Sequence, residues 1–316
     1  MSVQQITECT APVHIKLNQL TPQDFISYYN TNKAEFDHSL HTTGAIKFQG
    51  VSINGADDFQ LIIDSISSKF MNYIDGNSPR IKLSGNVYTS TEYDASQKIT
   101  MHNELSYSAK WPGKLFFSCI TPSETGGETL LAHSGDIYRA MHPSIIEEIE
   151  TRGICYIRNL HAGEGMGPSW QATFETESKA EVEKHLNAYN VKYEWGWLNN
   201  LKLKQFSKGV LGHQYTGQKV WFNQIDQFHP LHLGAEMFET LEIIYGETSS
   251  FPMYVSFADG KEISKDFVEA ILKTIETCTI APAWNTNELL IVDNELMSHG
   301  RNSFTGSRRV LVAMSA

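Results

Sequence analysis

The chain has 316 residues, of which 41% are hydrophobic and 19% are charged, a balance that excludes a disordered chain, a collagen-like repeat and a small disulfide-stapled protein. Its 25 basic and 36 acidic residues give a formal net charge of −11. Phosphate backbones and anionic membranes would repel such a surface, so we expect neither nucleic acid nor membrane as a partner.

The first third of the chain alternates helices with short strands. We predict a helix from Pro22 to Lys33, a strand at 45–51 and a second helix over 56–72, where Phe59, Ile62 and Ile66 recur at helical spacing. A strand at 114–121 then alternates between two faces and leads through Gly126 and Gly127 to an apolar segment at 129–132.

The second half begins with Ser134 as the N-cap of a short helix, followed by a longer helix after Pro143. We expect mixed short strands over 153–246, with a helix at 178–187, and a further helix at 264–278. Two buried strands close the chain at 289–292 and 310–314, joined by a polar loop.

This order of elements favours a mixed α+β fold with a double-stranded β-helix, or jelly-roll, barrel as its core. We expect one domain over residues 1–316, with core segments at about 80–135 and 280–316 and a helical or irregular insertion at about 140–280. The four cysteines are widely separated and the N-terminus lacks a signal-peptide pattern, so we expect a reduced, cytoplasmic protein without a membrane span.

One cluster of residues has metal-ligand chemistry. On an extended strand, His102 and Glu104 project to the same face, and His299, in the loop between the last two strands, could supply a third ligand. Two histidines and one carboxylate on one side of a metal leave open positions, the arrangement typical of non-haem Fe(II) oxygenases. The His-x-Glu match alone is weak evidence, because chance supplies such pairs.

Longer segments give the cluster a context. The chain resembles the taurine dioxygenase-like family of Fe(II)/2-oxoglutarate oxygenases, and within it the branch found in peptide-antibiotic biosynthesis, with clavaminate synthase as a more distant member. The resemblance covers most of the chain from about Gly44 onward. The matching segments are MHNELSYSAKWPGKLFFSCITPSETGGETLLAHS, VWFNQIDQFH and LLIVDNELMSHGRNSFTGSRRVLVAM.

The resemblance implies that His102, Glu104 and His299 bind Fe(II), with 2-oxoglutarate as cosubstrate and O2 as oxidant. Halogenating relatives replace the carboxylate ligand by a small residue, so the presence of Glu104 favours hydroxylation over halogenation. The second arginine that binds sulfonate in taurine dioxygenase has no counterpart, because Val312 and Ala313 occupy that position.

The same resemblance implies a binding site for the distal carboxylate of 2-oxoglutarate. Thr129, 27 residues after His102, matches the hydroxyl that binds it. Arg308 and Arg309 are the two candidates for the arginine, and neighbours on a strand face opposite ways. Because Arg309 stands ten residues after His299, it fits the family offset better and we prefer it.

We therefore predict a dioxygenase that hydroxylates an unactivated C–H bond of an amino acid or amino-acid-derived substrate in specialised metabolism. Desaturation or ring closure would use the same residues. A redox-silent metal enzyme, such as a zinc lyase or hydrolase, and an inactive binding protein are the remaining alternatives. The sequence leaves open whether the substrate is free or bound to a carrier protein, although the acidic charge mildly favours a free one. It does not address the oligomeric state.

Overall fold

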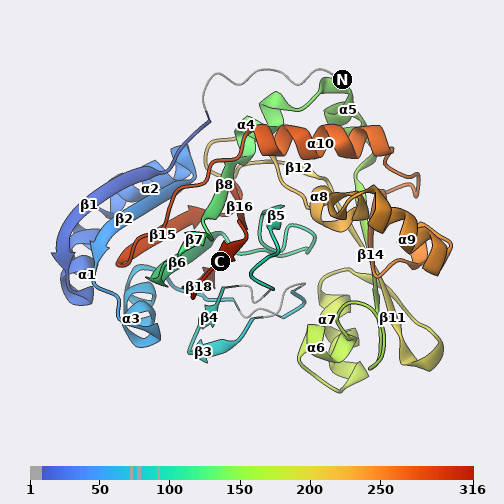
Figure 1. Cartoon of the computed structure of the whole chain (residues 1–316), viewed down its shortest axis with the longest axis horizontal. Coiled ribbons are helices and arrows are strands. Elements are labelled where there is room, and N and C mark those ends of the chain that lie inside the picture. Colours follow the sequence, from blue (N-terminus) through green and yellow to red (C-terminus); the bar gives the residue numbers. More distant parts are fainter. Residues whose placement is uncertain (1–8, 72–73, 77–79, 91–92) are drawn as a thin grey trace.

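Two β-sheets lie at the centre of the molecule (Figure 1). The computed structural model describes residues 9–71, 74–76, 80–90 and 93–316. The strands of the large sheet, in spatial order, are β1 (Val13–Leu20), β2 (Ala45–Val51), β15 (Glu288–Asp293), β6 (Lys114–Thr121), β18 (Arg309–Ser315), β4 (Val87–Thr89) and β3 (Lys82–Ser84). The small sheet contains β5 (Ile99–His102), β16 (Met297–Arg301) and β8 (Thr129–His133). Only the β1–β2 pair is parallel within these two sheets as described.

A hydrophobic core joins the two sheets. Phe117, Leu290 and Val312 from the large sheet pack in one buried cluster with Leu131 and Met297 from the small sheet. These strands were predicted from their apolar alternation, and β2, β6 and β15 lie where the sequence placed them. The expectation of a mixed helix and sheet fold is confirmed.

Three N-terminal helices cover the outer face of the large sheet, on the left of Figure 1. They are α1 (Pro22–Thr31), α2 (Lys33–Thr43) and α3 (Ala56–Ile66). The first predicted helix is divided at Asn32. The second predicted helix, α3, ends six residues before the predicted Asn72, which lies outside the described residues. Ser67 ends this helix because its backbone is extended.

A second group of helices packs on the outer side of the small sheet. It contains α4 (Ser134–Ala140), α5 (Pro143–Arg152), α8 (Ile225–Phe228) and α10 (Lys265–Thr277). Leu130 and Met101 from the small sheet lie in one apolar cluster with Ile137, Ile145 and Ile271 from these helices. Ser134 is the first residue of α4, one position inside the helix compared with its predicted role as N-cap.

The segment at 140–280 contains more regular structure than predicted. Its antiparallel sheet has the order β10 (Lys192–Trp195), β11 (Leu201–Ser207), β9 (Ile154–Leu160) and β14 (Met253–Phe257). It also contains α6 (Trp170–Phe174), α7 (Lys179–Ala188) and α9 (Ala235–Tyr245) (Figure 1). The short strands and the helix expected within 153–246 are present, whereas the broader description of the insertion as helical or irregular leaves out this sheet, in which β9 pairs with two strands distant in sequence.

Short elements complete the fold: β7 (Thr125–Gly126), β12 (Val210–Gly212), β13 (Lys219–Trp221), β17 (Phe304–Thr305), and the 3-10 turns η1 (Trp197–Asn199), η2 (Pro230–Leu233) and η3 (Thr248–Ser250). Among the residues described here, no helix is both long enough and apolar enough to cross a bilayer. All four cysteines are free thiols.

Candidate metal centre

His102, Glu104 and His299 converge in the interior, with one ligand atom of each within 4.8 Å of the others. The sheet explains the two histidines: β5 and β16 are antiparallel, and His102 pairs directly with His299, so the rings lie 4.3 Å apart between centroids. All three residues are at least 94% buried. His299 therefore lies on strand β16 and not in a loop as predicted.

Glu104 reaches the cluster by a different route from the predicted one. Strand β5 ends at His102, and Glu104 lies in the turn that follows, so the two residues do not share a strand face. Leu105 has a left-handed backbone, with φ of 55°. The tight turn reverses the direction of the chain directly after strand β5. It thereby places the Glu104 carboxylate beside the imidazole rings of His102 and His299.

A buried asparagine fixes the backbone of Glu104. Asn294 accepts a hydrogen bond at Oδ1 from the Glu104 N–H over 2.7 Å, and its Nδ2 donates to the Glu104 carbonyl over 3.0 Å and to the Pro112 carbonyl over 2.8 Å. Because Asn294 lies in the turn between β15 and β16, one side chain connects the backbones that carry Glu104 and His299.

Two polar residues near the cluster have structural roles. Asp293 accepts hydrogen bonds from the backbone N–H groups of Glu295 and Leu296 and lies 3.2 Å from His213 Nε2, so it orients none of the three ligands. Gln224 Nε2 donates to the carbonyl of Asn103 over 2.8 Å. That bond stabilises the backbone just before the turn that contains Glu104.

The ionisation of the cluster suits a metal ion. Burial, with the nearby His299, lowers the pKa of His102 to about 3, so its ring is neutral. Burial alone would raise the pKa of Glu104, but the Arg80 guanidinium and both histidines outweigh it and the net pKa lies below the ordinary value. The cluster therefore contains a neutral imidazole and a carboxylate, which are the protonation states that bind metals.

The orientation of His102 adds to this fit. Its Nδ1–H donates to the carbonyl of Thr100 over 2.9 Å, which fixes the tautomer and leaves the Nε2 lone pair for a metal. Nε2 of His299 lies 3.6 Å from Glu104 Oε2, so these donor atoms also face one another. Two imidazole nitrogens and one carboxylate oxygen fit Fe(II) with open positions.

A small cavity of about 30 Å³ adjoins the cluster. It is lined by Arg80, Ser90, Ile99, His102, Phe117, Thr129, His299, Gly300, Arg301, Arg308 and Val312. This volume holds about one or two water molecules, so side chains must shift when a larger ligand enters. The cavity brings together five of the six residues that the sequence singled out, either as its lining or, for Glu104, as a direct neighbour; Arg309 is the exception.

Thr129, the first residue of strand β8, lines the cavity. Its hydroxyl oxygen accepts a hydrogen bond from Trp284 Nε1 over 2.9 Å. Because the indole occupies one lone pair of the oxygen, the hydroxyl hydrogen is directed elsewhere and is available to an acceptor in the cavity.

The geometry favours Arg308 over Arg309, which the sequence analysis preferred. Arg308 lines the cavity, whereas Arg309 is exposed as the first residue of β18. Nε of Arg308 donates to the Gly127 carbonyl over 2.8 Å and Nη1 donates to Ser90 Oγ over 3.1 Å. Burial lowers the pKa of Arg308 to about 10, so it stays a cation at neutral pH.

Gly127 is required where it contacts this arginine. Its φ is +71°, and a Cβ there would lie 3.0 Å from Arg308 Cδ and 2.4 Å from Ser123 Oγ. The Gly-Gly turn that the sequence marked between two strands therefore allows the Arg308 side chain to pass close to the backbone.

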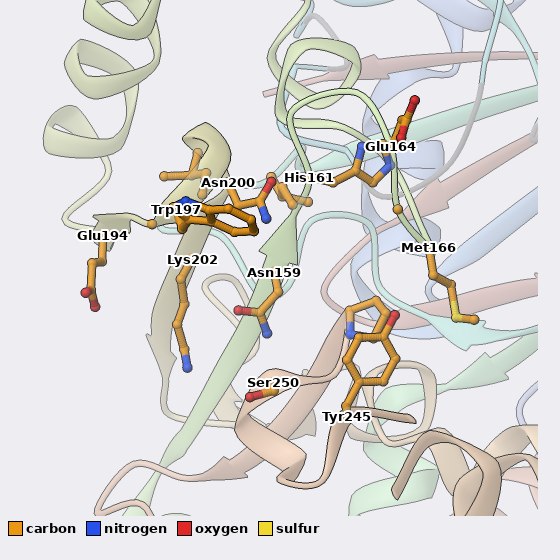
Figure 2. Close-up of a pocket in the computed structure, with 15 residues that line it drawn as sticks. Asn159, His161, Glu164, Met166, Glu194, Trp197, Asn200, Lys202, Tyr245 and Ser250 are labelled. Carbon is orange, nitrogen blue, oxygen red and sulfur yellow. The ribbon is translucent and has the colours of Figure 1, made fainter. Parts of the chain in front are cut away.

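A larger cavity, of about 520 Å³, lies in the insertion and is lined by none of the six predicted site residues (Figure 2). Its wall includes Trp197, which is 84% exposed, together with Tyr245 and Lys202. The metal-ligand cluster, not this open depression, contains the groups with redox-metal chemistry.

A buried two-histidine, one-carboxylate centre beside a threonine and an arginine defines the class of Fe(II)- and 2-oxoglutarate-dependent oxygenases. The chain matches the family described as "Taurine catabolism dioxygenase TauD, TfdA family" over residues 4–314, and it belongs to that family. Fe(II) and 2-oxoglutarate are accordingly its cofactor and cosubstrate, and the residues present fit that role.

Two curated relatives are similar over most of the chain. The dapdiamide synthesis protein DdaC of Enterobacter agglomerans is 32% identical over 278 residues, which cover 88% of this chain and 84% of the relative. A clavaminate synthase-like protein of Arabidopsis thaliana is 30% identical over 300 residues, covering 92% and 87%.

Solved structures share the fold at low identity. An asparagine oxygenase in complex with Fe(II), 2S,3S-3-hydroxyasparagine and succinate has a TM-score of 0.58 at 11% identity, with 95% of this chain and 92% of that chain covered. The structure of AAD-2 with Mn(II) and N-oxalylglycine gives 0.55 at 12% identity, covering 100% and 96%.

Three residues at the site were missed by the sequence interpretation: Arg80, Trp284 and Asn294. Arg80 and Trp284 stand in irregular segments with no local pattern, so no sequence signal identified them. Asn294 contacts Glu104 across a separation of 190 residues, so only the structure reveals its role.

Proposed function

We propose that this oxygenase hydroxylates an unactivated C–H bond of an amino acid or an amino-acid-derived substrate, and that its two central sheets form a jelly-roll barrel. The observation that carries the proposal is the convergence of His102, Glu104 and His299 beside a cavity that also contains Thr129 and Arg308. An asparagine oxygenase with hydroxyasparagine among the structural neighbours, and the relative DdaC from dapdiamide synthesis, support the amino-acid class.

In this proposal the three ligands hold Fe(II) on one side and leave the other side for the reactants. When bound, the iron with 2-oxoglutarate and O2 supplies the oxidation: one oxygen atom enters the substrate C–H bond as hydroxyl, the other enters succinate, and CO2 is released. Arg308 and the Thr129 hydroxyl bind the distal carboxylate of 2-oxoglutarate, since a forked cation suits a buried carboxylate.

The protein's remaining contributions are to position the reactants and to exclude water from the metal centre. The ligands are at least 94% buried, and Asn294 and Thr100 hold two of them by backbone hydrogen bonds. A rigid and water-poor centre favours reaction at one substrate carbon over side reactions with water or protein. A cytoplasmic location remains a prediction from the sequence.

The test is a screen of free amino acids for stimulated release of succinate from 2-oxoglutarate by the Fe(II)-loaded protein. We expect turnover that requires Fe(II) and is inhibited by Zn(II). A product heavier by one oxygen atom identifies hydroxylation, whereas loss of two hydrogens identifies desaturation or ring closure. A zinc-dependent hydrolase or lyase is the second candidate, and full activity with Zn(II) and no need for 2-oxoglutarate would establish it instead.

A further inference from the structure

A cavity of about 530 Å³ lies next to the small cavity at the metal-ligand cluster, and Ile99 lines both. Thr100, the next residue of β5, lines the larger cavity, and its carbonyl accepts the hydrogen bond from Nδ1 of His102. Strand β5 therefore contributes to the wall of the larger cavity and also supports a metal ligand. Because the small cavity holds only about one or two water molecules, most of a substrate that reacts at the metal must lie in neighbouring space.

Arg301 connects the two cavities from the other ligand strand. It lines the small cavity, two residues after His299 on β16. Its guanidinium donates to the carbonyls of Tyr93, Asp94 and Gln97, and both Tyr93 and Gln97 line the larger cavity. One edge of the larger cavity is thus fixed to the strand that carries His299, so a molecule bound there keeps a constant position relative to the metal ligands.

Apolar side chains form most of the wall of the larger cavity. They come from separate elements of the insertion: Phe228 of α8, Leu233 of η2, Leu241 of α9 and Met253 of β14. Leu233 is 58% exposed, and Met166, which is labelled in Figure 2 and also lines the open depression shown there, is 51% exposed. Exposed apolar side chains around a hollow whose volume falls in the range of roughly 300 to 1,000 Å³ indicate a small-molecule site.

The charges of this wall disfavour a cationic ligand. Among the lining residues that the structure describes, none is acidic, and Lys98 is the only one with a full charge. Nδ1 of His232 lies 2.9 Å from the carbonyl of His229, and burial lowers the pKa of His232, so its ring is neutral at neutral pH. An ammonium group in the cavity would lose water without gaining a counter-ion, whereas an apolar group would be stabilised.

We propose that this cavity holds an uncharged apolar arm of the substrate while the carbon to be oxidised lies at the metal. This inference rests on the proposed function and narrows its substrate class to amino-acid-type compounds with a long aliphatic or aromatic group. That group is either the side chain of the amino acid or an acyl chain on its nitrogen, since both present the same apolar surface to the wall. Leu233 selects for the arm by apolar contact at the edge of the cavity.

Calorimetric titration of the protein loaded with Mn(II) and 2-oxoglutarate measures the binding of defined probes. L-Norleucine and L-2-aminobutyrate have a long and a short aliphatic side chain, L-lysine ends a chain of similar length in an ammonium group, and Nα-hexanoyl-L-alanine places the arm on the nitrogen. The variants are Leu233→Gln, Leu233→Met and, as a matched control, Ile243→Gln, which changes an aliphatic side chain of α9 that is 85% exposed and is not part of the cavity wall.

We expect wild type to bind L-norleucine about 10-fold more tightly than L-2-aminobutyrate, since each buried methylene tightens binding by roughly 3- to 4-fold, and to prefer it over L-lysine by a similar factor. Leu233→Gln should reduce this preference by about 3- to 10-fold, whereas Leu233→Met and Ile243→Gln should keep it. Tight binding of either long-armed probe supports the proposal and shows where the arm is attached. Equal affinities for the short, cationic and long probes, or equal effects of Leu233→Gln and Ile243→Gln, would overturn it.

Release of succinate by the Fe(II)-loaded protein separates this inference from the proposed function. Absence of any Fe(II)-dependent succinate release with amino-acid-type compounds would refute the proposed function. Release stimulated only by small polar or cationic amino acids would leave that function intact and would overturn the assignment of the cavity to an apolar arm.

Discussion

The indole of Trp284 donates a hydrogen bond to the hydroxyl of Thr129 across 2.9 Å, linking the loop before β15 to strand β8. The bond leaves the Thr129 hydroxyl hydrogen to point to another acceptor, which in the proposed site is the distal carboxylate of 2-oxoglutarate. In the proposed site, Trp284 thus orients the Thr129 hydroxyl so that its hydrogen can be donated to the cosubstrate.

Trp284→Phe should raise the KM for 2-oxoglutarate by roughly 2- to 10-fold, because the hydroxyl loses its fixed orientation while the aromatic packing is kept. Steady-state kinetics of succinate release measures the change. Trp195→Phe is the control, since that indole binds Glu183 in the insertion and should leave the KM unchanged. Equal effects of the two variants would contradict the proposed role of the bond.

Arg308 and Arg309 are neighbours in sequence, so a variant of one serves as the matched control for the same variant of the other. Arg308→Ala should raise the KM for 2-oxoglutarate by about 10- to 100-fold, because hydrogen bonds to a charged group are lost. Arg309→Ala removes the same side chain from an exposed position and should change the KM by less than roughly twofold. If Arg309→Ala has the larger effect, the original offset argument was correct and the cavity lining is misleading.

Removal of a ligand tests the metal centre itself. His299→Ala should abolish iron binding, because two remaining ligands cannot hold Fe(II) on one face. Iron per protein chain after anaerobic reconstitution is the measurement. His161→Ala, in the open cavity of the insertion, should retain full iron occupancy. Full occupancy in His299→Ala would disprove the assignment of the centre.

Asn294→Ala should lower the free energy of unfolding by about 2 to 4 kcal/mol and weaken iron binding, because three hydrogen bonds that hold Glu104 and Pro112 are lost. Asn223→Ala is the control: this buried side chain bonds to Gly209 and Ile225 and touches no ligand. We expect the control to lose stability but bind iron normally. Chemical denaturation and metal analysis separate the two effects.

A buried carboxyl on α8 predicts a pH-dependent stability. Burial raises the pKa of Asp226 to about 8, far above the value of about 3.9 in an unfolded chain. Between these values the folded protein holds a proton that the unfolded chain has released, so the free energy of unfolding falls as pH rises from about 4 to about 8.

Asp226→Asn removes this dependence. The free energy of unfolding of the variant should exceed that of wild type at pH 8 by roughly 5 kcal/mol, with little difference near pH 4. Urea midpoints at both pH values test it. Asp259→Asn, at an exposed carboxylate that pairs with Arg152, should bring no such gain. A constant difference across the pH range would show that hydrogen bonding, and not ionisation, accounts for the effect.

Local pattern predicted the strands and long helices well, since Ala45–Val51 and the amphipathic α10 carry their periodicity in a few residues. The three residues predicted as ligands do come together, but the reason given for Glu104 was wrong, because Glu104 lies in a turn and not on a strand face shared with His102. Arg80 could not be predicted, because its partner Glu104 is 24 residues away and their pairing depends on burial that only the folded chain creates.

The pairing of His102 with His299 joins residues 197 positions apart in the chain. During synthesis the first ligand strand is complete long before its partner has been translated. The protein must therefore acquire its metal after the C-terminal strands have left the ribosome, and a chain truncated before β16 would be produced without the means to bind iron at all.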